Sequence, residues 1–479
     1  MTDNSTNPSV RHVARVTLEL KTPLHLGSGR SGDFTDAELV YDVNGLPAIP
    51  GSSIAGVLRS LYGKDSPEAE AIFGSSKENP SGKGSRLSVS WACIHDSHDR
   101  PVEGLIDPST LSEDKVLKLA RAPSLRDHVR ITHAGVADAG NRGKFDEVSL
   151  QIGHRFTFEF ELRGPAAQSE VDQAALVQLI EKINEPSFRL GGKTRRGFGA
   201  VAICRVATAS FDLADDEERA RYLKHPVSLA ESSNELKSLS LGPSAGAQCF
   251  ARLDLKANGF WMFGGGTDYP ENTPHWSPVD MAPVRDTVIA WENGNRAKAM
   301  EKCFILPASS IKGALAHRTA FHYNCLAGRF IDPDTSGQEK LLAEYATNNP
   351  AIDALFGSSN DTDPDKGQRG HVIIDDSYLK PSEAETRRVP HVSIDRFTGG
   401  ALDGALFDER PISGGGFPLE IYLDRDPGEL EEKALEAFRR ALRDLAEGRL
   451  ALGAGGGRGN GFFEGQVNFM EVQQEKVSA

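Results

Sequence analysis

The chain contains the same ordered set of short motifs twice, and this duplication constrains its fold more than any other feature of the sequence. Four segments of the first half recur in the second half in the same order, 257 to 283 residues further on. The matched pairs are IPGSSIAGVL (49–58) with LPASSIKGAL (306–315), IFGSS (72–76) with LFGSS (355–359), HVRITHAGVADAGNRGKFDEV (128–148) with HVSIDRFTGGALDGALFDER (391–410), and LGGKTRRGFG (190–199) with LGAGGGRGNGFF (452–463). Four matches in one order indicate a tandem duplication.

The duplication predicts two related domains, at residues 1–211 and 247–479. Residues 212–246 lie between them and are predicted to be a linker. This stretch opens with acidic residues and closes with serine, glycine and proline, a composition that suits a linker with a short helix inside it.

Each copy predicts the same order of elements, namely strand, helix, strand, strand, helix and strand. Alternating apolar and polar residues mark the strands, and apolar residues at helical spacing mark the helices. The predicted strands are 13–20, 86–94, 156–162 and 198–206 in the first copy, and 250–257, 371–379, 417–423 and 462–469 in the second. The first predicted helix of each copy follows a proline, Pro50 or Pro307, and Ser52 or Ser53 is the expected N-cap in the first copy. The second predicted helix covers 171–183 in the first copy and 428–448 in the second. This is the ferredoxin-like order, so we expect an α+β fold of two modified ferredoxin-like domains.

Charge and composition exclude several classes of protein. Lys and Arg number 54 against 68 Asp and Glu, a formal net charge of −14, which argues against indiscriminate binding of polyanions. The five cysteines form no CxxC pair, so neither a zinc site nor a disulfide framework is indicated. No apolar run approaches the ~18 residues of a membrane span, and the first residues do not resemble a signal peptide. We therefore expect a soluble, cytoplasmic protein with no membrane partner.

The glycine-rich loop near the end of each copy is a candidate phosphate-binding element. Clustered glycines expose successive backbone N–H groups that can surround phosphate oxygens, and basic side chains add charge. The alternative is a plain tight connection between helix and strand. The candidate residues are Lys193, Arg195, Arg196, Arg458 and Asn460.

The helix that follows each Pro-x-Ser-Ser motif is a second candidate. A helix N-terminus with two hydroxyl groups attracts phosphate through unpaired N–H groups and the helix dipole. The alternative is simple capping beside solvated charges. The candidate residues are Ser52, Ser53, Arg59, Ser309, Ser310, Lys312 and Arg318.

Long polar insertions separate the two middle strands of each copy. Residues 128–150 and 391–416 are rich in glycine, and each insertion contains Phe-Asp near its end, at Phe145 and at Phe407. Long structured protrusions from a compact domain are usually functional or disordered. Their duplication favours function.

Together these motifs resemble the RAMP superfamily. The resemblance is carried by TPLHLGSG, GLPAIPGSSIAGVLRS, IFG, the insertion and GGKTRRGFG, and it covers nearly the whole chain outside the linker and termini. More narrowly, the chain is similar to the backbone subunits of type III CRISPR effector complexes. A fusion of two such subunits resembles the type III-D arrangement.

The resemblance implies modified RRM-like domains that polymerise along a CRISPR guide RNA. The glycine-rich loop and the serine helix would hold the guide backbone, and the insertion would act as a thumb that splays a base at regular intervals. The implied partners are guide RNA, complementary target RNA, and the other RAMP, large and small subunits of the complex. The implied thumb residues are His128, Arg130, Phe145, His391 and Phe407.

The resemblance also implies cleavage of target RNA by an aspartate in the loop after the first strand, with Mg²⁺ or Mn²⁺. In the first copy Asp36 fits best and Asp33 is the alternative; in the second copy Asp280 fits best and Asp286 is the alternative. The second copy has extra sequence, NGNRAKAMEKC (293–303), before its LPASS motif, so its alignment is less certain there. Each aspartate could instead be a turn residue.

The implied chemistry is physically sensible, because RNA carries its own nucleophile in the 2′-hydroxyl group. A protein then needs only to hold the linkage in line and to offset the developing charge. An ionised carboxylate can anchor a divalent cation or orient the hydroxyl group.

Two other functions stay open at this point. The chain could be a structural backbone subunit that does not cleave RNA. It could also be an endonuclease that processes guide RNA with histidine as general acid or base, for which His25, His128 and His133 are available.

Overall fold

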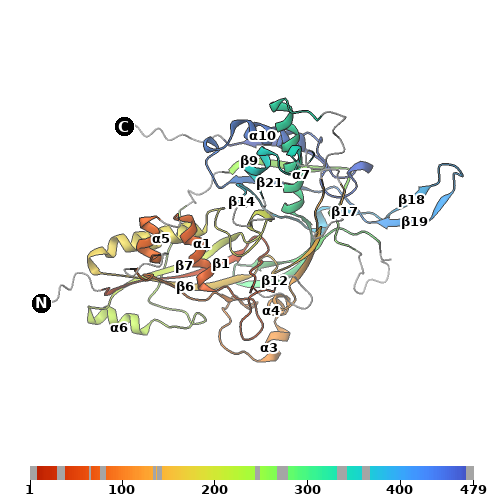
Figure 1. The fold of residues 1–479 in the computed structure, drawn as a ribbon. Helices are drawn as coiled ribbons and strands as arrows, with labels where there is room; N and C mark the ends of the chain where they lie inside the picture. The colour runs from red at the N-terminus through yellow and green to blue at the C-terminus, as the bar shows by residue number, and fades with distance from the viewer. Residues whose placement is uncertain are drawn as a thin grey trace.

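The protein consists of two stacked α+β domains (Figure 1). The computed structural model describes residues 8–29, 38–63, 66–75, 82–132, 136–137, 143–242, 249–266, 279–331, 342, 344–358 and 367–470. Three predicted site residues, Asp33, Asp36 and His133, lie outside the described residues.

The first domain is built on a mainly antiparallel sheet of strand order β2-β6-β1-β7-β8, with β3 paired to β6. Its strands are β1 (Val10–Leu20), β2 (Leu87–Val89), β3 (Cys93–Ile94), β6 (Arg155–Gly164), β7 (Val201–Asp212) and β8 (Lys237–Ser238). Helices α1 (Gly51–Leu61), α2 (Pro67–Phe73) and α5 (Ser169–Ile183) contribute to the same core as the sheet. Figure 1 shows α1 and α5 above one face of the sheet.

The second domain repeats this plan with strand order β15-β21-β9-β22. Its strands are β9 (Cys249–Asn258), β15 (Val372–Ile374), β21 (Gly416–Leu423) and β22 (Phe462–Phe469). Helices α7 (Ala308–Ala327), α9 (Pro350–Phe356) and α10 (Glu432–Ala446) pack with this sheet around a second core. In α10, apolar residues at helical spacing, Leu435, Phe438, Leu442 and Leu445, form a buried stripe.

Smaller elements surround the two sheets. In the first domain they are α3 (Pro108–Glu113), α4 (Lys115–Ala120), β4 (Ser124–Val129), β5 (Lys144–Ser149) and α6 (Asp216–Lys224). In the second they are β10 (Phe260–Trp261), β11 (Arg285–Glu292), β12 (Arg296–Leu306), β13 (Gly357–Ser358), β14 (Gln368–Arg369), β16 (Ser377–Leu379), β17 (Glu385–Thr386), β18 (Val389–Ile394), β19 (Ala401–Glu409) and β20 (Ile412–Ser413). None of the described helices is both long and apolar enough to cross a membrane.

Most of the predicted strands and helices are confirmed, but the predicted strands 86–94 and 371–379 are each divided into two short strands, β2 and β3 and β15 and β16, and β16 pairs with β12 in another sheet. The predicted serine cap is wrong. Helix α1 begins at Gly51 with Pro50 as its N-cap, and no side chain makes a cap hydrogen bond there. Ser52 and Ser53 therefore belong to the first helical turn. The proline enters the cap position because its fixed φ suits a helix start, which places the serines further into the helix.

The predicted linker contains the expected helix, α6. This segment lies against the first domain, because Arg15 of β1 donates hydrogen bonds to the backbone oxygens of Pro226 and Glu231, at 3.1 and 2.6 Å. Strand β8 then pairs with β7. The described part of residues 212–246 thus extends the sheet of the first domain.

Arg126 of β4 lies at the centre of the contact between the two domains. Its side chain is 4% exposed, forms an ion pair with Asp376, and approaches the carboxylate of Asp286 at 3.5 Å. It also donates a 3.0 Å hydrogen bond to the Tyr378 hydroxyl. Burial raises the pKa values of both aspartates, and the guanidinium opposes that rise. One cation therefore compensates two buried carboxylates across the domain boundary.

The hairpin of β11 and β12 holds the domains together at a second place. It contains the extra sequence 293–303 of the second copy, and Figure 1 shows β12 beside α4 of the first domain. Its contacts with the first domain are Ile289 N to Ile152 O (3.2 Å), Ala297 N to Ser97 O (2.8 Å), Trp291 Nε1 to Gly153 O (2.7 Å) and Arg155 Nη1 to Gly294 O (2.7 Å). The β11–β12 hairpin, which includes the extra sequence, thus binds the second domain to the first.

We expect Arg126→Met to lower the free energy of unfolding by about 3–5 kcal/mol, because two buried carboxylates lose their shared cation. Urea denaturation followed by circular dichroism measures the loss. The matched control is Arg252→Met on β9, whose ion pair with Glu420 is 46% and 41% exposed and should change stability by no more than about 0.5 kcal/mol. Equal losses in the two variants would show that Arg126 does not hold the domains.

Candidate nucleic-acid interface

The two glycine-rich loops have the same backbone conformation. Positive φ angles occur at the same four places of each loop, in the first at Gly191, Lys193, Gly197 and Gly199, and in the second at Gly453, Gly455, Gly459 and Gly461. A short 3₁₀ turn lies between the second and third of these places in both loops. The predicted correspondence of the loops therefore extends to each residue.

The loops are tied to the strand that precedes the candidate aspartates. Gly191 lies so close to this segment that a Cβ atom would come within 2.2 Å of the His25 backbone oxygen, and at Gly453 the same distance to Met262 is 2.3 Å. Only glycine fits such an approach with a positive φ. The loop and the segment after the first strand are therefore held at a fixed distance.

A buried glutamate links the first thumb hairpin to the first glycine-rich loop. Glu147 of β5 is 2% exposed, and its carboxylate lies 2.5 Å from Lys193 Nζ, 3.6 Å from Arg196 Nη1 and 3.3 Å from His128 Nε2. Burial alone raises the pKa of Glu147, but the hydrogen bonds from His128 and Lys193 outweigh it and hold the pKa at about 2. The carboxylate is thus ionised at any physiological pH.

The second domain repeats this arrangement. Glu409 of β19 is 1% exposed and lies 2.8 Å from His391 Nε2 and 2.7 Å from Arg458 Nη2. Asn460 donates a longer hydrogen bond of 3.5 Å to the same carboxylate. The glutamate again joins a thumb histidine to a loop cation.

An aromatic stack completes each cluster. The rings of His128 and Phe145 are stacked at 5.2 Å, and those of His391 and Phe407 at 4.8 Å. Loop cations lie over the same phenylalanines, with Arg196 5.3 Å from the centroid of Phe145 and Arg458 5.9 Å from that of Phe407. We call these two groups the thumb-root clusters; their members are His128, Phe145, Glu147, Lys193 and Arg196, and His391, Phe407, Glu409, Arg458 and Asn460.

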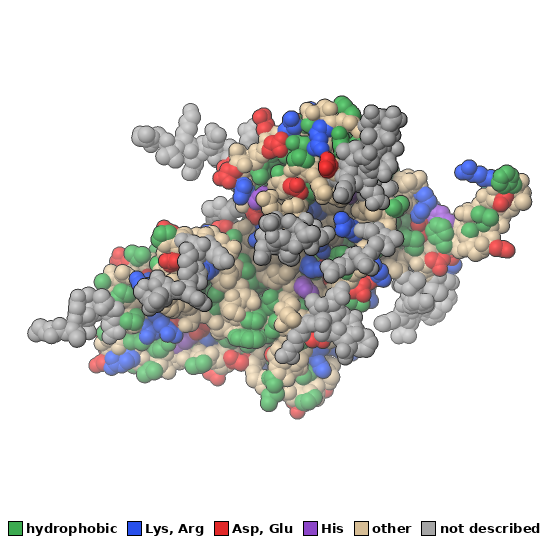
Figure 2. All heavy atoms as spheres, in the orientation of Figure 1, with side chains coloured by type: hydrophobic (Ala, Val, Ile, Leu, Met, Phe, Trp, Pro, Cys, Tyr) green, Lys and Arg blue, Asp and Glu red, His purple; other side chains and the backbone are tan. Residues whose placement is uncertain are grey.

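The thumbs themselves are hairpins that start from these clusters. Strands β4 and β5 form the first and β18 and β19 the second, which extends away from the body of the molecule in Figure 1. Figure 2 shows hydrophobic side chains along the second hairpin, and its exposed apolar residues are Val392, Ile394, Phe397, Leu402 and Leu406. Arg130, a predicted thumb residue, is exposed just beyond β4. Exposed apolar side chains on a projecting hairpin are suited to contact the faces of bases.

Asp280 lies at the root of the second thumb. Its exposed carboxylate accepts a 2.8 Å hydrogen bond from the backbone N–H of Asp408. The next residue, Met281, forms a parallel bridge with Glu409 of the thumb-root cluster. Asp280 and Met281 are therefore attached to β19.

The hydrogen-bond register relates Asp280 to Asp36. Gly27 bridges Leu39 in the first domain, and Gly264 bridges Pro283 in the second. In the sequence Asp36 stands three residues before Leu39, and Asp280 stands three residues before Pro283. Counted from these bridges, the two aspartates stand at corresponding sequence positions; because Asp36 lies outside the described residues, the site role of the pair stays a prediction.

The alternative aspartate of the second copy has different surroundings. Asp286 is 6% exposed in β11 and lies beside Arg126 at the domain boundary. A carboxylate enclosed in this way contributes to the contact between the domains.

A family comparison agrees with these observations. The model of the RAMP superfamily matches residues 17–202 and 255–464, one region in each domain. The chain belongs to the RAMP superfamily. RAMP membership supports a CRISPR-associated, RNA-binding role, and the two matched regions agree with a tandem RAMP fusion. The comparison with curated proteins gave no match.

Of the predicted RNA-binding cations of this RAMP protein, Arg195 and Lys312 lie at the domain boundary. Arg195 forms an ion pair with Asp424 and donates a 2.9 Å hydrogen bond to the backbone oxygen of Gly370. Lys312 donates a 3.1 Å hydrogen bond to the backbone oxygen of Arg195. Arg195 thus joins the first glycine-rich loop to the segments around Gly370 and Asp424 of the second domain, and Lys312 joins the same loop to helix α7.

Among the other predicted RNA-binding residues of the two helices, the serines lie in the first turns of α1 and α7, and the two arginines connect these helices to neighbouring elements. Ser52 and Ser310 are exposed, while Ser53 and Ser309 are partly buried. Arg59 donates a 3.0 Å hydrogen bond to the Gly74 backbone oxygen, and Arg318 forms an ion pair with Asp444 of α10. The two arginines therefore stabilise packing, while a ligand-binding role of the four serines stays a prediction.

His25, a candidate of the processing-endonuclease hypothesis that lies outside the thumb-root clusters, is enclosed. It is 7% exposed, and its Nδ1 lies 2.7 Å from the Val148 backbone oxygen. This contact connects the segment after β1 to the thumb strand β5, so a positioning role accounts for the side chain.

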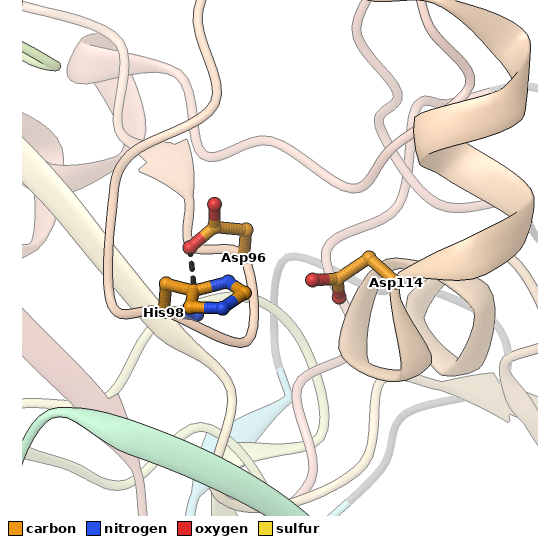
Figure 3. A group of neighbouring side chains, drawn as sticks. All are labelled: Asp96, His98 and Asp114. Carbon is orange, nitrogen blue, oxygen red and sulfur yellow. Dashed lines mark hydrogen bonds between the residues drawn. The ribbon is translucent and has the colours of Figure 1, made fainter.

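A group of three potential metal ligands, Asp96, His98 and Asp114, lies in the first domain (Figure 3). Asp96 Oδ1 accepts a hydrogen bond from the backbone N–H of His98, and its Oδ2 accepts from both Nε and Nη2 of Arg100. Asp114 accepts from Ser97 and caps helix α4. A turn and a helix cap therefore account for this group of side chains.

The two buried glutamates are not among the residues predicted from the sequence. The signal was present, because the Phe-Asp pair noticed in both insertions is followed by glutamate in both, at Glu147 and at Glu409. A charged residue next to a loop is normally exposed to solvent, so the burial of these glutamates could not be inferred from the sequence alone.

We expect Lys312→Met to raise the melting temperature more at about pH 6 than at about pH 9. Burial, with Arg195 and Arg196 nearby, lowers the pKa of Lys312 from 10.5 to about 7. The charged form is therefore penalised in the folded protein below about pH 7, and this penalty fades as the pH rises toward 10.5. Thermal denaturation at both pH values, with exposed Lys433→Met as control, measures it; a gain that does not depend on pH would contradict the expectation.

Proposed function

We propose that this RAMP protein is a guide-RNA-binding backbone subunit of a type III CRISPR effector complex, with the two-domain fusion of the type III-D arrangement. Each domain would be a ferredoxin-like, RRM-like module, an assignment supported by the matching strand orders β2-β6-β1-β7 and β15-β21-β9-β22. The two domains would form two successive segments of a guide-RNA filament.

The observation that carries the proposal is the repeated thumb-root cluster beside a candidate aspartate. In each domain a buried glutamate holds the root of a thumb against the cations of a glycine-rich loop. In the second domain Asp280 is fixed to the same root. A base displaced by the thumb and the RNA backbone held by the loop would meet beside that carboxylate.

Guide RNA would be held by the loops and the helix starts. Arg196 and Arg458 keep 48% and 44% of their side chains exposed while one end contacts the glutamate. The remaining N–H groups of these planar side chains can donate to phosphate oxygens. Backbone N–H groups of the glycine-rich loops would add contacts that do not depend on base sequence.

The proposed reaction is cleavage of complementary target RNA at each thumb, with Asp36 and Asp280 as the acidic residues. Displacing a base breaks the A-form stack, which frees the neighbouring 2′-hydroxyl group to line up with the adjacent phosphate. The carboxylate of Asp280 is exposed and uses one oxygen for the Asp408 N–H, so its other oxygen is available for Mg²⁺ or Mn²⁺. When bound, such a cation would offset charge that develops on the phosphate.

We expect guide-matched RNA to be cut at two sites of fixed spacing by the assembled complex. Asp36→Ala and Asp280→Ala should each remove one of the cuts, by about 10²-fold or more, because each thumb would act independently. Mapping the products on denaturing gels measures this. Asp254→Ala, an exposed aspartate of β9, is the control and should leave both cuts unchanged.

The same experiment separates the alternatives. Unchanged cleavage in the double variant, with guide RNA and assembly retained, would contradict the proposed role of the aspartates. No cleavage by the wild type would leave a structural backbone subunit. Loss of guide maturation after replacement of His25, His128 or His133 by alanine would favour a processing endonuclease.

We also expect Arg196→Met and Arg458→Met to weaken binding of single-stranded RNA and to flatten its salt dependence. Each lost phosphate contact should reduce the slope of log Kobs against log salt by about 0.7. Fluorescence anisotropy at several salt concentrations measures the slope. Arg219→Met on α6, whose side chain is 46% exposed, is the control; an equal change there would exclude a specific role for the loops.

A further inference from the structure

The contact between the two domains joins two different surfaces. We call the surface of the first domain that carries Arg126, Arg189 and Arg195 the donor surface. The acceptor surface of the second domain consists of three aspartates and the β11–β12 hairpin. The ion pairs between them are Arg126 with Asp376, Arg189 with Asp375 and Arg195 with Asp424.

A contact between two different surfaces can in principle form again between one chain and the next. Because both domains share one fold, the second domain has its own donor position and the first has its own acceptor position. Head-to-tail contacts that do not close generate open filaments. Copies of this chain would therefore add end to end if the chemistry of the contact were the same at both ends.

The donor position of the second domain has lost all three arginines. The glycine-rich loops align through the hydrogen bonds of Leu190 with Gly199 and of Leu452 with Gly461. The thumb roots align because Arg126 pairs with Glu147 and Val389 pairs with Glu409 in the strand ladders. The correspondences are Arg126 with Val389, Arg189 with Ala451 and Arg195 with Gly457.

The acceptor position of the first domain has lost all three aspartates. The alignment is fixed on both sides, by the pairing of Leu87 with Leu162 and of Val372 with Leu423, and by that of Ile49 with Ala92 and of Leu306 with Ser377. The correspondences are Asp375 with Ser90, Asp376 with Trp91 and Asp424 with Arg163.

The β11–β12 hairpin also has no counterpart in the described residues 38–50 of the first domain. Where the second domain has the β11–β12 hairpin, the first has a tight turn in which the N–H groups of Asn44 and Leu46 donate to Asp42. A second copy docked at this position would thus find neither the hairpin nor the three carboxylates. At the three aligned positions it would bring Val389, Ala451 and Gly457 in place of arginines.

We propose that this chain does not extend itself through its interdomain contact, and that the acceptor position of its first domain binds a domain of the same superfamily from a different chain. That domain would present apolar side chains where the first domain presents arginines. The inference stands on superfamily membership and on the contact between the domains, and goes beyond the proposed function.

The chemistry of the free surface indicates an apolar partner. Trp91, Tyr41 and Val43 are 53%, 40% and 73% exposed. They lie in or beside neighbouring strand segments, since Tyr41 bridges Pro47 and Ile49 bridges Ala92. The same segments of the second domain form the sheet β11-β12-β16, which the first domain covers. Exposed aromatic residues at a position that is an interface in the sister domain mark a protein-binding surface.

The first test is self-association of the isolated full chain. Sedimentation velocity over about a hundredfold range of concentration, at low and high salt, should show a single-chain species throughout. Oligomers whose cross-links join the acceptor position of one first domain to the donor position of another chain's second domain would overturn the proposal.

The second test asks whether the arginines decide the contact. The variant Arg126→Val, Arg189→Ala, Arg195→Gly gives the first domain the residues of the second. We expect the amides of Ile289 and Ala297, which donate across the boundary, to exchange at least about tenfold faster, while amides of β9 remain protected. Unchanged protection would overturn the proposal. If β9 also loses protection, Arg189→Ala alone is used with the same criterion.

The third test concerns the partner. In the effector complex purified from cells that express all its subunits, Trp91 should lose reactivity to oxidative labelling several-fold relative to the isolated chain, with cross-links to a different chain. Equal labelling, or cross-links to a second copy of this chain, would overturn the proposal. A complex without guide RNA would contradict the proposed function instead and would leave the first two tests unaffected.

Discussion

The burial of Arg126 between Asp286 and Asp376 determines how the two domains meet, and the rest of the candidate interface depends on it. Asp376 uses its other oxygen to accept the N–H of Ala308 at the start of α7, at 2.8 Å. One carboxylate therefore fixes both the arginine of the first domain and the helix start of the second. At Gly197 a Cβ atom would lie 2.5 Å from that of Ala308, so the loop of the first domain reaches the helix of the second only as glycine. The first glycine-rich loop and the start of α7, both candidate phosphate-binding elements, become neighbours as a result.

Comparison of the two copies separates two kinds of residue. Both copies retain the glutamate, histidine and phenylalanine of the thumb-root cluster and the positive φ angles of the glycine-rich loop. They differ at the residues that form the contact between the domains. A function performed twice requires the first set in both copies, whereas a contact that is made once requires each member of the second set only on its own side. The residues shared by both copies are therefore those of the repeated cluster, and the residues that differ are those of the single contact between the domains.

Much of the fold could be predicted from the sequence, because strands and helices leave a local record in the spacing of apolar residues. Helix α10 is an example, since the stripe that includes Phe438 is visible in the sequence and buried in the structure. The cap of α1 was predicted wrongly because proline, rather than serine, occupies the N-cap position. Arg195 and Lys312 could not be placed, because a cation has the same sequence signature whether it meets a phosphate or a carboxylate of another domain. Glu147 and Glu409 were not predicted for a related reason, because the burial of a charge depends on partners that are distant in the sequence.

Under the proposed function, the thumb-root glutamates would also explain how an acidic chain binds RNA selectively. With a net charge of −14 the protein does not attract polyanions over its whole surface. At the thumb root the ionised glutamate neutralises part of the loop charge, which lowers attraction at long range, and it holds the cations in one orientation. In the proposed function, a correctly placed phosphate would meet donors whose conformational entropy has already been lost, so the gain in affinity would be largest for a strand that matches the spacing of the two loops. The same carboxylate that reduces indiscriminate binding thereby favours a strand of defined geometry.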